Sequence, residues 1–309
     1  MPIMRDFFLM LSTNAVVRNF VVKFQLTRRV TRRFVAGETL EEAIEVVRKL
    51  NQQKIDVTFD QLGESVTTEA EARATKDGYL RALDAIAAAK VSSEVSVKLT
   101  AMGLDLGADL CMANMREILT RAKAIGTAVT IDMEDSAHTQ VTLNIFKTMR
   151  EEFDNVGIVL QAYLYRSEAD ARALTGMGAA VRLCKGAYKE PANLAFPAKK
   201  DVDANYLKLA EIFFQASGNG KRPYLELATH DEKIIRWAEE YTTQNKIGHD
   251  RFEFQMLYGI RSDLQRRLVA DGYKMRVYVP YGTHWYPYFM RRLAERPANV
   301  IFLVSNLFK

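Results

Sequence analysis

Residues 128–163, AVTIDMEDSAHTQVTLNIFKTMREEFDNVGIVLQAY, hold the pattern that decides the fold. Two short β-rich runs, 128–132 and 157–163, lie on either side of a helical pattern at 136–152. Parallel strands need a crossover of a dozen or more residues, and a helix of this length provides one. The stretch therefore predicts one β-α-β unit.

The same unit recurs along the chain. The other β-rich runs lie at 56–60, 94–99, 179–185, 223–229, 251–257 and 274–280, and further helical patterns lie at 69–90, 110–125, 203–217 and 231–246. Eight β/α units predict an α/β fold in the form of a (β/α)8 TIM barrel. A doubly wound sheet is the alternative, but the sequence has no Pro/Gly/Ser-rich linker between two domains. We expect a barrel catalytic domain at 51–309 and an N-terminal helical arm at 1–50.

The composition is that of a globular protein. Of the 309 residues, 48% are hydrophobic and 26% are charged, which is enough apolar material for a large core. No apolar run approaches the roughly 20 residues of a membrane-spanning helix, and the N-terminal apolar segment is too short for a signal peptide. We therefore expect a cytoplasmic protein. Cys111 and Cys184 lie in unlike contexts, which indicates reduced thiols without structural zinc.

The basic residues outnumber the acidic ones by 43 − 38 = 5, and much of this surplus lies in RNFVVKFQLTRRVTRRF at 18–34. Such a basic amphipathic stretch can contact anionic lipid or nucleic acid. Charge runs are more often the solvated faces of packed helices. The second interpretation is therefore favoured. The overall charge alone decides little.

Polar residues stand at the carboxyl ends of seven consecutive predicted strands. These residues are Lys98, Asp132, Gln161, Arg182 with Lys185, Thr229 with His230, Gln255 and Tyr278. One such residue is ordinarily a loop-edge side chain in water. Seven in succession are better explained by one shared pocket, because the active sites of (β/α)8 barrels lie at the carboxyl ends of the strands.

Several common motifs are missing. GMGAAV at 176–181 precedes a strand and lacks the last glycine of a dinucleotide-binding fingerprint, so it indicates a turn. The sequence has no P-loop and no His-Glu-x-x-His motif. Asp132 and Glu134 can in principle ligate a divalent cation, but Asp135 and Ser136 fit a helix N-cap better, and we expect no metal.

The segment RLCKGAY at 182–188 indicates an anionic ligand. Arg182 and Lys185 supply cationic groups, Gly186 allows a close approach of the backbone, and Tyr188 offers an aromatic face. This combination suits a phosphate-bearing or anionic planar molecule. A strand end with a surface Arg and Lys is the alternative for this segment alone.

The stretch WYPYFMRRLAERPAN at 285–299 predicts a helix that begins at Pro287. Tyr288, Arg291, Arg292 and Glu295 then occupy positions i, i+3, i+4 and i+7, where an apolar stripe normally lies. A polar face in this position suggests that the helix covers a ligand.

Several of these segments together resemble the proline dehydrogenase family. The resemblance rests on VKLTAMGLD, IDMED, VRLCKGAY, ATHD, FEFQMLYG and VYVPYGTHWYPYFMRRLAERPAN, and it runs from about FDQLGE at 59–64 to the C-terminus. It implies a distorted (β/α)8 barrel with extra N-terminal helices and a last helix over the barrel mouth. It also implies FAD as a non-covalent cofactor and the oxidation of L-proline to Δ1-pyrroline-5-carboxylate by hydride transfer to flavin N5.

The resemblance also implies the partners of the enzyme. The chain looks like the short, monofunctional bacterial form, which would be reoxidised by a membrane quinone and would pass its product to a separate pyrroline-5-carboxylate dehydrogenase. Quinone use implies peripheral contact with the inner face of the membrane, and the basic N-terminal stretch is one candidate surface. No nucleic-acid partner is expected.

By matched position, the resemblance assigns roles to individual residues. Those implied to contact the flavin are Met133, Gln161, Lys185, Gly186, Ala187, Thr229, His230 and Gln255. Those implied to bind proline are Lys98, Tyr188, Leu257, Tyr278, Tyr288, Arg291 and Arg292. Asp132 and Arg182 are the positions implied to be catalytic, and Glu64 is a hypothetical ion-pair partner of a pocket arginine.

Two other hypotheses remain open from the residues alone. A barrel can use Lys98 or Lys185 as a Schiff-base lysine in an aldolase-type reaction. The third hypothesis is a nucleic-acid-binding or membrane-binding protein that uses the basic arm beside an inert barrel, and it leaves the polar strand ends unexplained.

Overall fold

The structure is a computed structural model that describes residues 31–63, 65–216 and 223–295, without the side chains of 293–295. Eight parallel strands form a closed barrel in chain order, so the predicted (β/α)8 fold is confirmed. The strands are β1 (Asp56–Gln61), β2 (Ser93–Val97), β3 (Val129–Ile131), β4 (Val156–Gln161), β5 (Ala180–Cys184), β6 (Tyr224–Ala228), β7 (Phe252–Leu257) and β8 (Met275–Tyr281). β1 pairs with β8 from Asp56 opposite Arg276 to Gln61 opposite Tyr281, and this pairing closes the ring.

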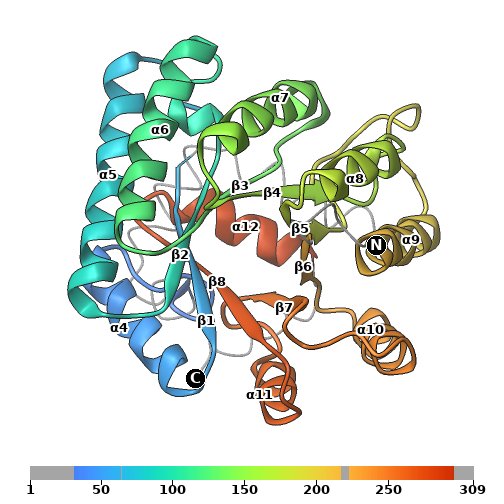
Figure 1. Cartoon of the computed structure of the whole chain (residues 1–309). Helices are drawn as coiled ribbons and strands as arrows, with labels where there is room; N and C mark the ends of the chain where they lie inside the picture. Colours follow the sequence, from blue (N-terminus) through green and yellow to red (C-terminus); the bar gives the residue numbers. More distant parts are fainter. Residues whose placement is uncertain (1–30, 64, 217–222, 296–309) are drawn as a thin grey trace.

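Helices alternate with the strands and surround the ring (Figure 1). They are α4 (Leu40–Gln52), α5 (Glu69–Ala89), α6 (Ala108–Ala124), α7 (Ser136–Glu152), α8 (Ser167–Gly176), α9 (Lys199–Gln215), α10 (Glu232–Gln244), α11 (Ser262–Ala270) and α12 (Trp285–Glu295), with a short 3-10 helix, η1 (Thr100–Met102). Local sequence explains several starts. Thr68 and Glu71 form a capping box before α5, and Asp135 accepts from two backbone N–H groups at the start of α7. The N-cap predicted for Asp135 is therefore confirmed.

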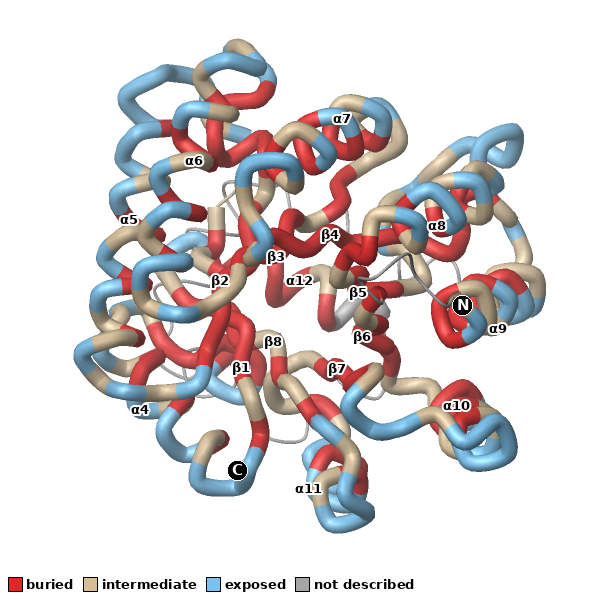
Figure 2. The backbone as a smooth tube through the Cα atoms, viewed as in Figure 1, coloured by how far each residue is buried: buried red, intermediate tan, exposed pale blue. Residues whose placement is uncertain are grey.

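The strands divide their side chains between two environments. Their apolar residues, such as Val57, Val95 and Leu183, are fully buried in the layer between strands and helices. In Figure 2 the strands are coloured mainly as buried residues, and exposed residues lie on the outer turns of the helices. Because successive side chains of a strand point to opposite faces, the alternate residues Thr58, Ser96 and Arg182 point into the barrel. The barrel interior is therefore lined by polar groups.

A second apolar cluster lies at the end of the barrel that α12 covers. Phe34 and Val35 of the N-terminal segment pack there with Leu62, which follows β1, and with Trp285 and Phe289 of α12. In Figure 1 α12 lies across the centre of the ring of strands. The predicted position of the last helix is thus confirmed, although it begins at Trp285 and not at Pro287. A proline is tolerated in the first turn of a helix, where its missing N–H has no intrahelical partner.

The predicted boundary between an arm at 1–50 and a barrel at 51–309 remains a prediction. Residues 1–30, which include most of the basic stretch, lie outside the described residues. Of the predicted arm, α4 is described, and its residues Ala43, Ile44, Val47 and Leu50 belong to the main core of the barrel.

Candidate active site

Asp132 is the point at which side chains from several strands meet. It directly follows β3 and accepts hydrogen bonds from Ser96 Oγ at 2.6 Å and from Tyr278 Oη at 2.9 Å. Arg182 Nη1 donates to the same carboxylate at 3.0 Å, and Lys98 Nζ lies 3.4 Å from its other oxygen. Four of the predicted site residues, from β2, β3, β5 and β8, therefore form one connected group.

The charges in this group are fixed by their neighbours. Burial alone would raise the pKa of Asp132, but Lys98 and Arg182 hold it below its usual value, so the carboxylate is ionised. Burial alone would lower the pKa of Lys98, but Asp60, whose Oδ1 lies 3.2 Å from Nζ, contributes with Tyr278 and Asp132 to raise it well above its usual value. Lys98 is therefore a cation at neutral pH.

Tyr278 remains a hydrogen-bond donor in this environment. Burial, together with the carboxylates of Asp132 and Asp60, raises the pKa of Tyr278 well above its usual value. Its ring lies against Arg182, whose Cζ is 5.5 Å from the ring centroid. This is a cation–π distance, and it limits the freedom of the guanidinium.

Arg182 is buried, and hydrogen bonds hold its guanidinium in one orientation. Its Nε donates to Gln255 Oε1 at 2.6 Å, and its Nη1 donates to Ser96 Oγ at 2.9 Å as well as to Asp132. Nη2 lies 3.4 Å from Thr58 Oγ1. A guanidinium held on several sides supplies a positive charge at a fixed position within the barrel.

The barrel end also carries features that fit a flavin. Gln161, at the end of β4, donates through Nε2 to the Met133 carbonyl at 3.4 Å, while its buried Oε1 has no donor among the described residues. Gly186 has φ +108°, and a Cβ there would lie 2.3 Å from the Tyr163 ring, so the backbone approaches this ring as only glycine allows. An acceptor without a partner and a close-packed glycine turn are compatible with a planar ligand that carries N–H groups.

Lys185 lies away from the Asp132 group. Its Nζ contacts Asp203 Oδ1 at 2.5 Å and Asp231 Oδ2 at 2.8 Å, and Lys199 contacts the same two carboxylates. Thr229 Oγ1 accepts from the Asp231 backbone N–H at 3.1 Å. Lys185, Thr229 and the two aspartates thus form a second polar group, after β5 and β6.

The remaining predicted flavin residues are spread around these two groups. His230 Nε2 accepts from the Leu257 backbone N–H at 3.0 Å, so the end of β7 is held against the residues that follow β6. Met133 is buried, whereas Ala187 is exposed and Tyr188 is half-buried.

α12 carries three of the predicted proline-binding residues, Tyr288, Arg291 and Arg292. Tyr288 and Arg292 are buried, and Arg292 Cζ lies 5.0 Å from the centroid of the Tyr288 ring, while Arg291 is half-buried. Tyr288 belongs to the same apolar cluster as Leu62, and Leu257 packs against this cluster. Tyr288 thus lies in this apolar cluster and Leu257 lies against it. Both were predicted to bind proline. Glu64 lies outside the described residues.

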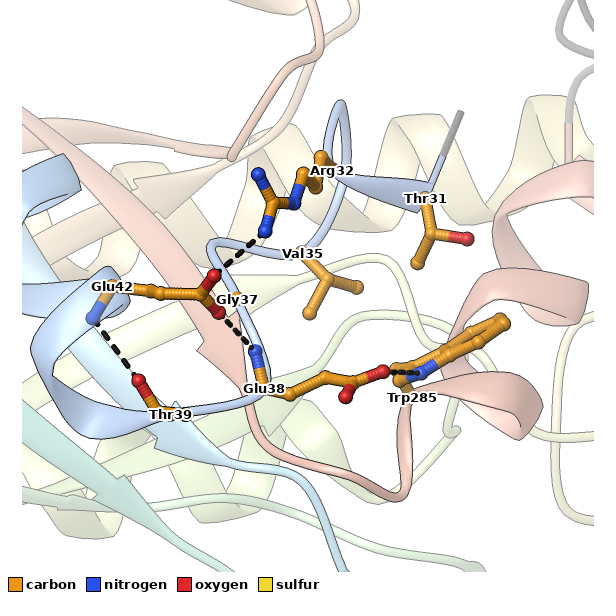
Figure 3. Close-up of a pocket in the computed structure, with 8 residues that line it drawn as sticks. All are labelled: Thr31, Arg32, Val35, Gly37, Glu38, Thr39, Glu42 and Trp285. Atoms are coloured by element: carbon orange, nitrogen blue, oxygen red, sulfur yellow. Dashed lines mark hydrogen bonds and ion pairs between the residues drawn. The ribbon is translucent and has the colours of Figure 1, made fainter. Parts of the chain in front are cut away.

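The first turn of α12 is anchored to the N-terminal segment (Figure 3). Trp285 Nε1 donates to Glu38 Oε1 at 3.1 Å, and the Glu38 backbone N–H donates to Glu42 Oε2 at 2.9 Å. A pocket of about 170 Å³ lies beside these residues and is lined by none of the predicted site residues. Trp285 itself is 2% exposed. The start of α12 is thus held by a defined polar contact in an otherwise apolar junction.

Some residues of the site were not predicted. Asp60, which pairs with Lys98, ends the run DVTFD at 56–60, so the strand-end rule that selected the other residues applied to it as well. Ser96 and Glu226 lie within strands and were hidden among apolar neighbours. For Ser96 the sequence does carry a signal, a period of two, because the polar residues at 94, 96 and 98 alternate with Val95 and Val97.

The described part of the chain has neither a metal-binding cluster nor a membrane-spanning helix. It contains no group of three or more His, Cys, Asp or Glu side chains arranged to hold a metal ion. Glu134, the second carboxylate of DMED, accepts hydrogen bonds from the Thr100 backbone N–H and hydroxyl. Within the same residues, no helix combines the length and the apolar character needed to cross a bilayer.

Comparisons with known proteins bear on this site. Residues 43–305 match the family model for proline dehydrogenase. Proline dehydrogenase 1 of Bacillus subtilis (strain 168) is 44% identical over 99% of both chains, and proline dehydrogenase of Deinococcus radiodurans is 44% identical over 90% of this chain and 89% of its own. Among solved structures, proline utilization A (PutA) of Bdellovibrio bacteriovorus matches with a TM-score of 0.83 and 25% identity, over 95% of this chain and 37% of that one.

Proposed function

The chain belongs to the proline dehydrogenase family, and on this premise we propose that it oxidises L-proline to Δ1-pyrroline-5-carboxylate with FAD as its cofactor. The observation that carries the proposal is the group formed by Lys98, Asp132, Arg182 and Tyr278 at the barrel end that α12 covers. It combines fixed positive charge with a closed, largely buried setting, as the oxidation of an amino acid with a carboxylate requires.

The residues that would hold the cofactor are those with the matching donor and acceptor types. The unpartnered Oε1 of Gln161 would accept from a ring N–H, and the backbone at Gly186 would lie against the cofactor. Lys185, beside Thr229, would supply positive charge for its phosphates. When bound, FAD would supply the acceptor for the hydride that leaves the proline carbon next to the ring nitrogen.

The carboxylate of proline would be bound by cations from both sides of the pocket. Lys98 directs its ammonium to Asp60 and Asp132, which leaves one of its three N–H groups for a ligand when the described residues are counted. Arg291 and Arg292 of α12 would pair with both carboxylate oxygens, because the guanidinium has a planar fork of donors. Tyr278 and Tyr288 would enclose the ring of proline. Glu64 is proposed as the ion-pair partner of one of the clamp arginines.

Asp132 and Arg182 would act on the reacting centre in opposite senses. Arg182 would stabilise negative charge that develops beside it during the reaction, because its guanidinium is already held in place by Gln255 and Ser96. The ionised Asp132 would offset the concentrated charge of Lys98 and Arg182 and hold both in position.

Reoxidation by a membrane quinone is also part of the proposal, together with transfer of the product to a separate pyrroline-5-carboxylate dehydrogenase. The protein would then be cytoplasmic with peripheral contact at the inner face of the membrane. The basic stretch at 18–34 is the proposed contact, because it can interact with anionic lipid. A variant that lacks residues 1–30 retains Phe34 and Val35, which pack against α12, and should bind anionic liposomes less than the full chain. Undiminished binding would assign the contact to another surface.

The Schiff-base alternative is not favoured. A lysine nucleophile needs a lowered pKa, whereas the pKa of Lys98 is raised by the carboxylates around it, and Lys185 is paired with Asp203 and Asp231. The cofactor is tested by heating the purified protein and identifying the released chromophore by its mass. We expect FAD in about equimolar amount. A colourless protein, or one that oxidises proline without a flavin, would overturn the proposal.

A further inference from the structure

A second polar layer lies deeper in the barrel than Asp132, and the proposed reaction does not use it. Glu94 on β2, Glu226 on β6, Glu253 on β7 and Arg276 on β8 form what we call the floor cluster. The three glutamates are 7%, 5% and 2% exposed, which is exceptional for carboxyl groups. Buried charges are costly unless they are paired, so each of these carboxyl groups must either have a cation near it or carry a proton.

Two of the three carboxyl groups have strong partners. Glu253 receives both Nε and Nη2 of Arg276, at 2.5 and 3.2 Å, and Tyr224 Oη lies 3.3 Å from it. Glu94 accepts from Thr58 Oγ1 at 2.9 Å and lies 3.6 Å from both Arg276 and Arg182. These contacts account for two carboxylates and for the charge of Arg276.

Of the three glutamates, Glu226 has the weakest electrostatic interaction with the two arginines. Its closest cation is Arg182, with Nε 3.5 Å from Glu226 Oε2, and this guanidinium already serves Asp132. Its other contact is with Gln255, whose Nε2 lies 2.6 Å from Glu226 Oε2 and 2.7 Å from Glu253 Oε1. Because Nε2 of Gln255 faces the glutamates, its Oε1 faces Arg182 Nε at 2.6 Å. Gln255 is therefore oriented by Glu226 and Glu253, and it in turn holds Arg182.

Within the described part of the chain, Glu226 has no counter-ion that is not shared with another carboxylate. The floor cluster and Arg182 together contain three carboxyl groups and two guanidiniums, and one of these guanidiniums is shared with Asp132. We propose that Glu226 is a neutral carboxylic acid in the enzyme, and that its proton keeps Arg182 paired with Gln255 and available to the active site. Glu226 is then a positioning residue, and this inference rests on the proposed function only for its effect on the reaction.

The surroundings of Glu226 support this protonation state. Burial raises the pKa of Glu226 to about 8, and the carboxyl groups of Glu94 and Glu253 add to the effect of burial. Arg182 and Arg276 act in the opposite direction and do not restore the usual value. Among the described residues, these four, from β2, β7, β5 and β8, are the charged groups that act most strongly on Glu226.

The consequence concerns Arg182. Above the pKa of Glu226, a carboxylate would lie 3.5 Å from Arg182 Nε and would compete with Gln255 Oε1 for this donor. The same negative charge would offset the positive charge that Arg182 presents to the reaction. Reduction of the enzyme by proline should therefore slow at alkaline pH in a way that depends on Glu226.

The first test uses the holoenzyme and proline in a stopped-flow spectrometer. Glu226→Gln keeps the shape of the neutral acid and cannot ionise. We expect the ratio of the variant's flavin reduction rate to that of the wild type to rise about fivefold between about pH 6 and about pH 9. Glu151→Gln, on the exposed surface of α7, is the control and should follow the wild type throughout. A ratio that does not change with pH would overturn the inference.

The second test needs neither proline nor turnover. Infrared difference spectra of the wild-type holoenzyme across the same pH range should show loss of the carbonyl band of a neutral carboxylic acid. Labelling with 13C-glutamate should shift this band, which separates it from Asp60, whose pKa is also raised by burial. The band should be absent in Glu226→Gln. Absence of a glutamate band in the wild type overturns the inference even if the variant does not fold, whereas failure to oxidise proline would contradict only the proposed function.

Discussion

Asp132 is the residue on which the arrangement of the site depends most. Its two oxygens are contacted by Ser96, Tyr278, Lys98 and Arg182, so one carboxylate orders donors that come from β2, β5 and β8. Asp132 directly follows β3, the shortest of the described strands. Its position is therefore set by these four contacts as well as by the strand.

Replacement of Asp132 by Asn should impair the reaction strongly. The amide cannot balance the charges of Lys98 and Arg182, and it has one acceptor oxygen where the carboxylate has two, so it loses the hydrogen bond from either Ser96 or Tyr278. We expect kcat/KM for proline to fall by about 100-fold, equivalent to about 3 kcal/mol of transition-state stabilisation. Steady-state kinetics measures this value. A decrease of less than about threefold would show that Asp132 is not central.

Tyr278→Phe tests one contact of this group. Loss of the Oη that donates to Asp132 should reduce kcat/KM about fivefold, the effect of about 1 kcal/mol. Tyr281→Phe is a matched control, because Tyr281 lies on the same strand, is buried, and contacts Gln61 outside the Asp132 group. In a double-mutant cycle with Asp132→Asn, the effect of Tyr278→Phe should largely disappear. Full additivity of the two changes would exclude this coupling.

At the residue scale, the strand-end rule selected residues that the structure brings together, but it did not select the polar residues beneath them. Lys98, Asp132, Arg182 and Tyr278 were predicted and are connected. Glu226 was not, because the run PYLELAT gives no sign that one charged residue among apolar ones points into a barrel. Which face of a strand points inward depends on the register of the whole barrel, and this is not contained in a single run.

α12 is the element that connects the active site to the N-terminal segment. Its aromatic residues pack with Phe34, whose ring centroid lies 6.1 Å from that of Phe289, and its first turn is fixed by the contact between Trp285 and Glu38. A helix that carries a proposed substrate clamp on one face and an anchor at one end transmits a change at the anchor to the clamp.

Trp285→Phe should therefore weaken proline binding more than it slows the chemical step. The change keeps an aromatic ring in the apolar cluster but removes the donor to Glu38. We expect KM for proline to rise about fivefold, from about 1 kcal/mol of lost hydrogen bonding, with kcat changed less. The chain's other tryptophan, Trp237, packs against Tyr241 on α10, and Trp237→Phe should leave both constants near the wild-type values. An unchanged KM in Trp285→Phe would refute the role of this anchor.

At the element scale, the sequence predicted the eight strands within one or two residues of their observed ends, because each is a short β-rich run. α8 and α11 were not predicted. They have 10 and 9 residues, and such short helices show too few turns for a helical period to be recognised. The start of α12 was predicted two residues late, because Pro287 was taken as its first residue and not as a member of the first turn.

Among the described residues, three groups of charged side chains lie at different levels of the barrel. The floor cluster lies deepest, the Asp132 group lies above it, and Lys185 with Asp203, Asp231 and Lys199 lies after β5 and β6. Each layer needs partners from strands far apart in the sequence, so the closed ring that joins β1 to β8 is what creates the site. Charge layers of this kind make both stability and activity depend on pH.

Stability in acid should depend on Asp231. Lys185 and Lys199 outweigh burial and lower the pKa of Asp231 to about 2, so its stabilising effect is present above the usual aspartate pKa and is lost as pH falls toward about 2. Because Asp231 is partly exposed, the effect is about 1 kcal/mol or less. Asp231→Asn, which can keep the cap of α10, should lower the Tm by about 2 °C at neutral pH, and the difference should vanish as the pH approaches 2.

The control for this experiment is Asp250→Asn, which removes an exposed carboxylate and should leave the Tm unchanged at both pH values. Differential scanning calorimetry gives the comparison. If Asp231→Asn and the wild type have equal Tm at neutral pH, the lysines do not stabilise the protein through this residue.

The central claim is that this barrel binds a flavin that proline reduces. The most direct measurement is the visible absorbance of the purified protein under anaerobic conditions before and after L-proline is added. We expect a flavin band at about 450 nm that is bleached by proline and restored by a quinone. A protein without this band, or one whose band is unchanged by saturating proline, would contradict the account.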